Sequence, residues 1–82
     1  VVLYTKAYCP FCQRALALLD SKGVDYTNID IGVHPERRDE MIDKANGGYT
    51  VPQIFINDEH IGGCDDMMAI EAQGLLDAKL NA

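Results

Sequence analysis

The spacing of apolar and polar positions predicts strands and helices in alternation along the first part of the chain. Residues 1–5 are β-branched and aromatic, which is typical of a short buried strand. After Pro10, apolar side chains recur at helical spacing from Phe11 to Lys22, and Gly23 is a typical residue just beyond a helix end. Residues 24–31 predict a second strand. A strand, a helix and a strand in this order form a βαβ unit, so the two strands are expected to pair in parallel.

The second half of the chain adds helices and a hairpin to this unit. The clusters Asn46-Gly47-Gly48 and Asn57-Asp58 are turn signals, and Gly74 interrupts the last helical pattern. The predicted elements are a polar helix over 35–45, strands over 51–56 and 59–61, a helix from about 64 to 73 and a final helical turn or two over 75–80. The order predicts one α/β domain over residues 1–82, with a four-stranded mixed sheet flanked by helices.

Composition and charge limit the kinds of partner that the protein can be expected to bind. The chain has 82 residues, of which 48% are hydrophobic and 24% are charged, as in an ordinary globular domain. No apolar run approaches the roughly 20 residues that span a bilayer. The formal net charge is −6, whereas binding to a phosphate backbone needs clustered Lys and Arg. We therefore expect neither a membrane nor nucleic acid among its partners.

Three cysteines carry the chemistry that the sequence offers: Cys9, Cys12 and Cys64. An odd count, with two of the three only three positions apart, is unlike the disulfide framework of a secreted domain. A C-x-x-C pair in a small intracellular protein indicates either a redox centre or a metal site. We expect a cytoplasmic protein, and the choice between these two kinds of site decides the function.

The redox interpretation follows from the place of the pair at the start of a predicted helix. The free N–H groups and the positive end of the helix dipole would face Cys9 and stabilise its thiolate, and Lys6 could add a positive charge. Cys12 falls one turn into the helix, with its side chain directed back toward Cys9. Cys9 is therefore the predicted nucleophile and Cys12 the predicted resolving thiol.

Zinc binding is the competing interpretation of the same cysteines. Cys9 and Cys12 together with His60 and Cys64 formally make a four-ligand set. However, 47 residues separate Cys12 from His60, and a C-x-x-C at a helix N-terminus is not a zinc knuckle. We expect no metal site, and we expect His60 to be an exposed residue of the hairpin.

Three segments in register give the chain a family resemblance over nearly its whole length. They are Tyr4-Thr5-Lys6 followed by Cys9-Pro10-Phe11-Cys12, then Thr50 to Ile56, and then His60 to Asp66. In these residues the chain resembles the glutaredoxins, and most closely the small bacterial dithiol members. The resemblance implies a thioredoxin-like fold and a glutathione-dependent thiol–disulfide oxidoreductase with catalytic Cys9 and Cys12. It implies glutathione as reductant and bound co-substrate, and as protein partners those that carry disulfides or glutathione mixed disulfides. A monomer is expected.

The resemblance also implies which residues contact glutathione. They are Lys6, Phe11, Thr50, Val51, Pro52, Gly63, Cys64, Asp65 and Asp66. Lys6 would pair with the glycine carboxylate, and the backbone of Val51, before a cis Pro52, would pair with the peptide as an added strand. The N–H groups of Cys64 and Asp65 would hold the γ-glutamyl carboxylate at a helix N-terminus.

Several of these assignments have alternatives. Asp65 or Asp66 could meet the glutathione amine or simply cap the helix. Arg37 or Arg38 could contact the glycine carboxylate, as in some relatives, or could simply lie on the solvated surface. Phe11 stands where many dithiol relatives have Tyr, so any hydroxyl contact is lost, and Cys64 could be no more than a small buried residue.

Two other activities remain open. Some glutaredoxins share an iron–sulfur cluster between two subunits, although Pro10 in the motif usually disfavours this. A redox protein reduced directly by thioredoxin reductase is the second, and Lys6 with Gly63-Cys64-Asp65 favours glutathione over it.

Overall fold

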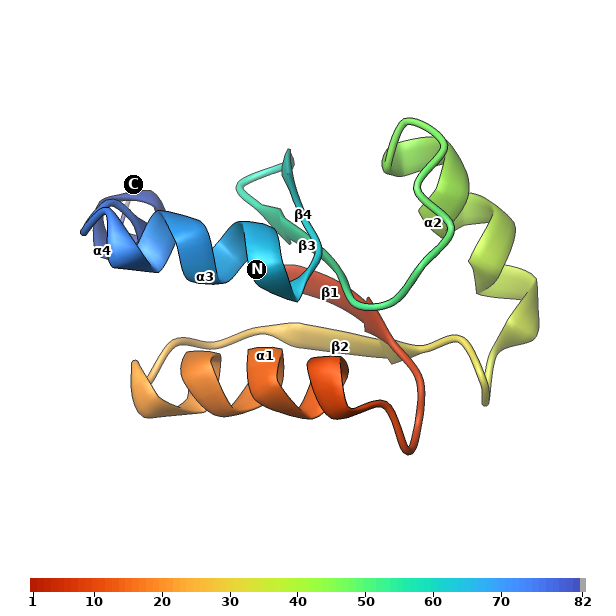
Figure 1. Cartoon of the computed structure of the whole chain (residues 1–82). Helices are drawn as coiled ribbons and strands as arrows, with labels where there is room; N and C mark the ends of the chain where they lie inside the picture. The colour runs from red at the N-terminus through yellow and green to blue at the C-terminus, as the bar shows by residue number, and fades with distance from the viewer. Residues whose placement is uncertain (82) are drawn as a thin grey trace.

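The computed structural model describes residues 1–81 and shows a four-stranded mixed sheet flanked by helices (Figure 1). The elements in chain order are β1 Val2–Thr5, α1 Pro10–Ser21, β2 Thr27–Asp30, a 3₁₀ turn η1 Pro35–Arg37, α2 Arg38–Lys44, β3 Gln53–Ile56, β4 Glu59–Gly62, α3 Cys64–Ala72 and α4 Leu76–Leu80. The predicted fold class is confirmed. Within residues 1–81 no helix is long and apolar enough to cross a membrane.

Strand order places the end of β1 at the centre of the molecule. The order across the sheet is β2-β1-β3-β4, with β1 parallel to β2 and antiparallel to β3. Tyr4 pairs with Ile29 on one side and with Gln53 on the other. The loop that leaves β1 therefore emerges beside the start of β3, although the two lie far apart in the sequence.

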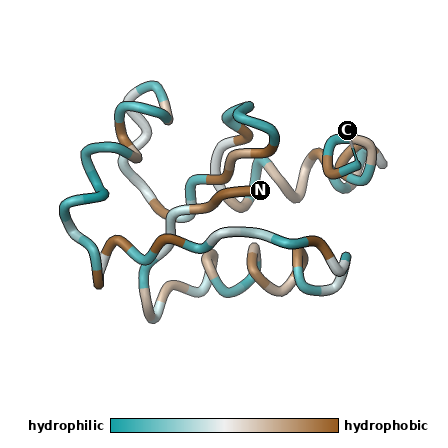
Figure 2. The backbone as a smooth tube through the Cα atoms, turned by 180° about the vertical axis from the view of Figure 1, so that it is seen from behind, coloured by the Kyte–Doolittle hydropathy of each residue, from teal (hydrophilic) through white to brown (hydrophobic). Residues whose placement is uncertain are grey.

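Each face of the sheet has its own hydrophobic cluster, because successive residues of a strand point to opposite faces. Leu3 and Ile54 face α1 and α3, while Tyr4 and Phe55 face α2. Figure 1 shows α2 set apart from α1 and α3 in agreement with these two clusters. In Figure 2 the trace of α1 alternates between hydrophobic and hydrophilic segments, as expected for a helix with one buried side.

Some predicted boundaries were too wide. Strand β2 covers Thr27–Asp30 rather than residues 24–31, because β1 offers only four residues to pair with. Strand β3 begins at Gln53 rather than at residue 51, since Pro52 has no N–H to donate to a ladder. The helix predicted from residue 35 opens as the 3₁₀ turn η1 before α2 begins.

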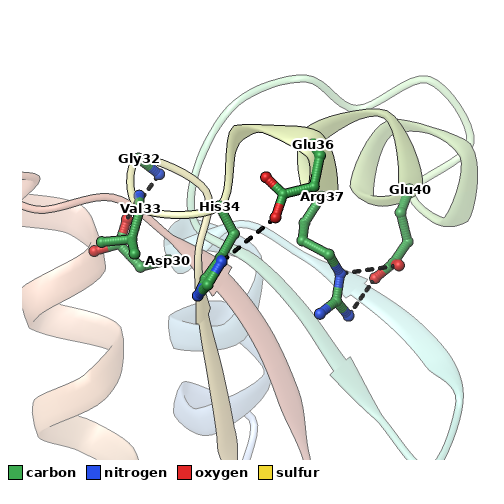
Figure 3. A network of polar contacts seen from close by, with 7 residues as sticks. All are labelled: Asp30, Gly32, Val33, His34, Glu36, Arg37 and Glu40. Atoms are coloured by element: carbon green, nitrogen blue, oxygen red, sulfur yellow. Dashed lines mark hydrogen bonds and ion pairs between the residues drawn. The ribbon is translucent and has the colours of Figure 1, made fainter.

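Polar contacts fix the connection from β2 to α2 (Figure 3). The Asp30 carboxylate accepts hydrogen bonds from the N–H groups of Gly32 at 2.7 Å and Val33 at 3.1 Å, which closes the turn after β2. One turn of helix further on, the guanidinium of Arg37 forms two hydrogen bonds with the Glu40 carboxylate, at 3.0 and 2.8 Å. Arg37, at the end of η1, is thus paired with Glu40 in the first turn of α2.

The Glu40 carboxylate also anchors α2 to the sheet. The hydroxyl of the buried Tyr4 donates to Glu40. Burial, followed by the contact with Glu40, raises the pKa of Tyr4 to about 12. Hydrogen bonds from Arg37 and then from Tyr4 lower the pKa of Glu40 to about 2. The phenol therefore keeps its proton and the carboxylate stays ionised around neutral pH, which keeps this donor–acceptor pair intact.

Candidate active site

Cys9 lies at the N-cap of α1, immediately before Pro10. Its sulfur accepts a hydrogen bond from the backbone N–H of Cys12 at 3.3 Å, and the side chain is half-buried. Pro10 begins the helix at a position where an N–H would have no helical partner. The free N–H groups of the first turn and the helix dipole stabilise a negative charge at this place. The geometry suits a thiolate nucleophile.

Cys12 lies in the first turn of α1, and its side chain is fully buried. Burial, and then the contact with Cys9, raises the pKa of the Cys12 thiol to about 12. Cys12 is therefore protonated while Cys9 reacts, and it can act only after the first bond to Cys9 has formed. This order is the one that a nucleophile and a resolving thiol require.

The backbone of Val51 forms the opposite wall beside Cys9. The sulfur of Cys9 lies 3.9 Å from the carbonyl oxygen of Val51, and the Val51–Pro52 peptide bond is cis. Among residues 1–81 the N–H of Val51 has no hydrogen-bond partner. An unpaired backbone donor next to the reactive sulfur is suited to pairing with an extended peptide.

The N-terminus of α3 closes the far end of the site. Gly63 is the N-cap, and its N–H donates to the Asp66 carboxylate at 2.9 Å. Asp66 is thus engaged in capping, whereas Asp65 is exposed and forms no ion pair with the residues described. Cys64 is buried, and burial followed by the charge of Asp65 raises the pKa of its thiol.

These segments line one groove with a volume of about 490 Å³. The residues that line it are Phe11, Gly48, Thr50, Val51, Pro52, Gln53, His60, Gly62, Gly63, Cys64, Asp65 and Asp66. The structure therefore gathers at this groove every residue predicted to contact glutathione except Lys6. Lys6 is exposed in the loop between β1 and Cys9 and is absent from the lining.

Two exposed aromatic residues, Tyr8 and Phe11, lie on either side of Cys9 in the sequence. Phe11 is about half exposed, and the guanidinium of Arg14 lies 5.7 Å from the centre of its ring. Tyr8, which the sequence analysis did not single out, is 99% exposed and has a φ of 60°. An exposed aromatic residue directly before the nucleophile offers an apolar surface that a partner protein could contact.

The prediction that His60 is an exposed hairpin residue is wrong. His60 is half-buried, its ring lies 5.1 Å from that of Phe55, and its Nε2 lies 2.7 Å from Oε1 of Gln53. The hairpin register pairs His60 with Phe55, so period-two alternation could have placed it on the face of Gln53. Across residues 1–81, no group of three His, Cys, Asp or Glu side chains is arranged to hold a metal ion. The four-ligand zinc set is therefore not assembled.

Sequence comparison now decides the family, because a family model described as Glutaredoxin matches residues 1–61. The chain belongs to the glutaredoxin family. Among its glutaredoxin relatives, Glutaredoxin 3 of Escherichia coli K12 is 54% identical over 80 residues, which cover 98% of this chain and 95% of the relative. A glutaredoxin of Pseudomonas aeruginosa is also 54% identical, over 82 residues that cover 100% of this chain and 96% of the relative.

Solved glutaredoxin structures share the fold. A buckwheat glutaredoxin–glutathione complex superposes with a TM-score of 0.88 at 32% identity, covering 98% of this chain and 74% of that one. With this family, this thioredoxin-like fold and a cysteine pair at a helix N-terminus, the glutaredoxin described here is a thiol–disulfide oxidoreductase.

Burial predicts selective alkylation of this glutaredoxin. We expect iodoacetamide at neutral pH to modify Cys9 in the reduced native protein and to leave Cys12 and Cys64 unmodified, because both are buried with raised thiol pKa values. Intact-mass spectrometry should show one label under native conditions and three in denaturant. Labelling of Cys12 or Cys64 as fast as Cys9 would contradict this interpretation.

Proposed function

We propose that this glutaredoxin uses glutathione as its reductant and bound co-substrate, and that it reduces protein disulfides and protein–glutathione mixed disulfides. The observation that carries the proposal is the continuous groove from Phe11 and Val51, beside Cys9, to the N-terminus of α3. Its volume lies within the roughly 300–1,000 Å³ usual for small-ligand sites. The buckwheat relative, which was solved as a glutathione complex, supports the same ligand.

The groups that line the groove match the parts of glutathione. The free N–H and the carbonyl of Val51 can pair with the peptide backbone next to the sulfur. At the N-terminus of α3, the N–H groups of Cys64 and Asp65 can hold the γ-glutamyl carboxylate, and the exposed Asp65 carboxylate can pair with the neighbouring ammonium. Asp66 is assigned to capping instead, because its carboxylate already binds Gly63.

No Lys or Arg is among the described residues that line the groove, so the cation that pairs with the glycine carboxylate must lie next to the groove. Arg37 is engaged with Glu40 and Tyr4, which argues against it. Lys6 is exposed in the loop that leads to Cys9, and Arg38 is exposed at the start of α2. We assign the contact to Lys6, since its loop leads directly to the nucleophile.

The proposed cycle begins when the Cys9 thiolate attacks the glutathione sulfur of a mixed disulfide. The bond between that sulfur and the protein breaks, and the protein thiolate leaves and takes up a proton. A second glutathione thiolate then attacks the sulfur held on Cys9, which releases oxidised glutathione and restores Cys9.

For a protein disulfide, the Cys9 thiolate attacks one of the two sulfurs, and the other leaves as a thiolate that takes up a proton, so the substrate is joined to Cys9 by a mixed disulfide. Cys12 then loses its proton and attacks the Cys9 sulfur, which breaks the mixed disulfide, releases the second substrate thiol and closes a Cys9–Cys12 disulfide. Two glutathione molecules reduce this disulfide and leave as oxidised glutathione.

A reductant exchange experiment tests the proposal. Turnover of a glutathionylated peptide is expected with glutathione, glutathione reductase and NADPH, and no turnover is expected with thioredoxin reductase and NADPH alone. Equal turnover with thioredoxin reductase would contradict the proposal. An absorbance spectrum of anaerobically purified protein tests the iron–sulfur alternative, which requires visible absorption from a cluster.

The remaining parts of the proposal concern partners and location. Exposed Tyr8 and Phe11, on either side of Cys9 in the sequence, support protein substrates, since a small thiol would not need an apolar surface outside the groove. We also propose that the protein works as a monomer and in the cytoplasm, where the reducing environment would keep Cys9 and Cys12 as thiols between turnovers.

A further inference from the structure

Along one wall of the groove, the side chains of His60 and Gln53 form a chain of hydrogen bonds that ends on the backbone next to Val51. His60 Nε2 lies 2.7 Å from Gln53 Oε1, and Gln53 Nε2 donates to the carbonyl of Thr50 at 2.9 Å. We infer that Gln53 and His60 are positioning residues which orient the Thr50–Val51 peptide unit for binding the backbone of glutathione. The inference rests on the function proposed above.

The direction of each hydrogen bond follows from the chemistry of the groups. The Thr50 carbonyl can only accept, so the Gln53 amide must present its NH₂ group there. The amide oxygen then faces His60, and because that oxygen also only accepts, His60 Nε2 must carry a proton. A neutral ring with its proton on Nε2 and a fully protonated ring both meet this condition. The chain of hydrogen bonds therefore persists in either charge state of His60.

The planarity of the peptide bond carries this constraint into the groove. The Thr50 carbonyl and the Val51 N–H belong to one peptide unit, which is trans, since the cis bond in this segment is Val51–Pro52. In a trans unit the C=O and the N–H point in opposite directions within one plane. The hydrogen bond from Gln53 to the Thr50 oxygen therefore fixes the plane of this unit and directs the unpaired Val51 N–H away from Gln53, as a donor for an incoming peptide.

Packing leaves the Gln53 amide little freedom to turn. Gln53 is only 4% exposed, and a Cβ at Gly48 would lie 3.0 Å from its Nε2, so even a methyl group at position 48 would crowd the amide. The His60 ring is held in turn by its contact with Phe55, at 5.1 Å between ring centres. The segment that leads to Val51 belongs to no strand or helix, so the hydrogen bonds from Gln53 hold it in place of backbone pairing.

Two substitutions at His60 separate the hydrogen bond from ring packing. His60→Phe keeps a ring against Phe55 but removes the donor, whereas His60→Gln keeps a donor at a similar reach and removes the ring. We expect His60→Phe to raise KM for a glutathionylated peptide by about 3- to 10-fold, which corresponds to one hydrogen bond, with kcat nearly unchanged. His60→Gln should recover most of the wild-type KM. Ile61→Val, on the same strand with its side chain against the other core, serves as the matched control for lost packing.

A Gln53 variant and the tautomer of His60 test the same chain of hydrogen bonds. Gln53→Met, with similar volume and no amide, should raise KM as His60→Phe does, while the rate of Cys9 alkylation by iodoacetamide stays at the wild-type value in both variants. In the wild-type protein, long-range ¹⁵N NMR should find the proton of the neutral His60 ring on Nε2. A wild-type KM in folded His60→Phe, or the Nδ1–H form of the ring, would overturn the inference while leaving the proposed function standing. Failure of the wild-type enzyme to use glutathione would overturn both.

Discussion

Cys9→Ser is expected to abolish reduction of both glutathione mixed disulfides and protein disulfides, by roughly 10³-fold or more. Every step in the proposed cycle passes through the Cys9 sulfur, and a serine hydroxyl is not ionised at neutral pH. The hydrogen bond from the Cys12 N–H and the helix dipole, which stabilise a thiolate, cannot compensate for this. Retention of either activity in Cys9→Ser would show that Cys9 is not the nucleophile.

Cys12→Ser is the companion experiment and should separate the two activities. The structure gives Cys12 no part in the first attack, because it is buried and its thiol pKa is raised to about 12. We expect Cys12→Ser to keep reduction of glutathione mixed disulfides within a few-fold of wild type and to lose reduction of protein disulfides. Both rates are measured in the same glutathione reductase-coupled assay. Equal loss of both would contradict the assigned roles, provided that circular dichroism shows a native fold.

Gly62→Ala should give the largest loss of stability among single-methyl additions at the site. Gly62 has a φ of +117°, and an added Cβ would lie 2.3 Å from the Asp66 carboxylate oxygen that caps α3 through Gly63. The alanine would combine backbone strain of about 1–3 kcal/mol with the loss of a cap worth about 1 kcal/mol. We expect a decrease of about 2–4 kcal/mol in the free energy of unfolding, measured by urea denaturation. Because the N-terminus of α3 would move, KM for glutathione should also rise.

Gly23→Ala provides the matched control for this substitution. Gly23 also has a positive φ, of +66°, but no atom lies within 4 Å of an added Cβ. Gly23→Ala should therefore lower the free energy of unfolding by only about 1 kcal/mol, the cost of placing a non-glycine residue in the left-handed region. Its KM for glutathione should stay at the wild-type value. A Gly62→Ala variant no less stable than Gly23→Ala would show that the contact with Asp66 can be relieved.

The parts of the site that sequence could predict are the local ones. Cys9 and Cys12 lie within one turn of a helix whose start and spacing are legible in neighbouring residues. The three motif segments also converge as the family resemblance implied, since Val51 and Gly63 line one groove.

What sequence did not predict depends on contacts between distant segments. The environment of His60 depends on the register of β3 with β4, for which alternation gives only the face, and on the direction of one amide, which leaves no periodic signal. The hydrogen bond from Tyr4 to Glu40 is similar, since Tyr4 is 36 positions away from Glu40 in the chain. The pairing of Arg37 with Glu40, by contrast, is an i, i+3 pair, which helical spacing could have predicted.

The central place of β1 has a consequence for how the enzyme matures. Cys9 follows β1, and Val51 precedes β3, so pairing of β1 with β3 is what joins the nucleophile to its groove. Pairings between segments that are distant in sequence close slowly compared with local ones. A chain that has folded only its βαβ unit already carries both redox thiols but not the surfaces that choose their partner. We therefore expect reactivity to come before selectivity during folding: until the second half of the chain docks, the thiols would lack the groove that selects their partner.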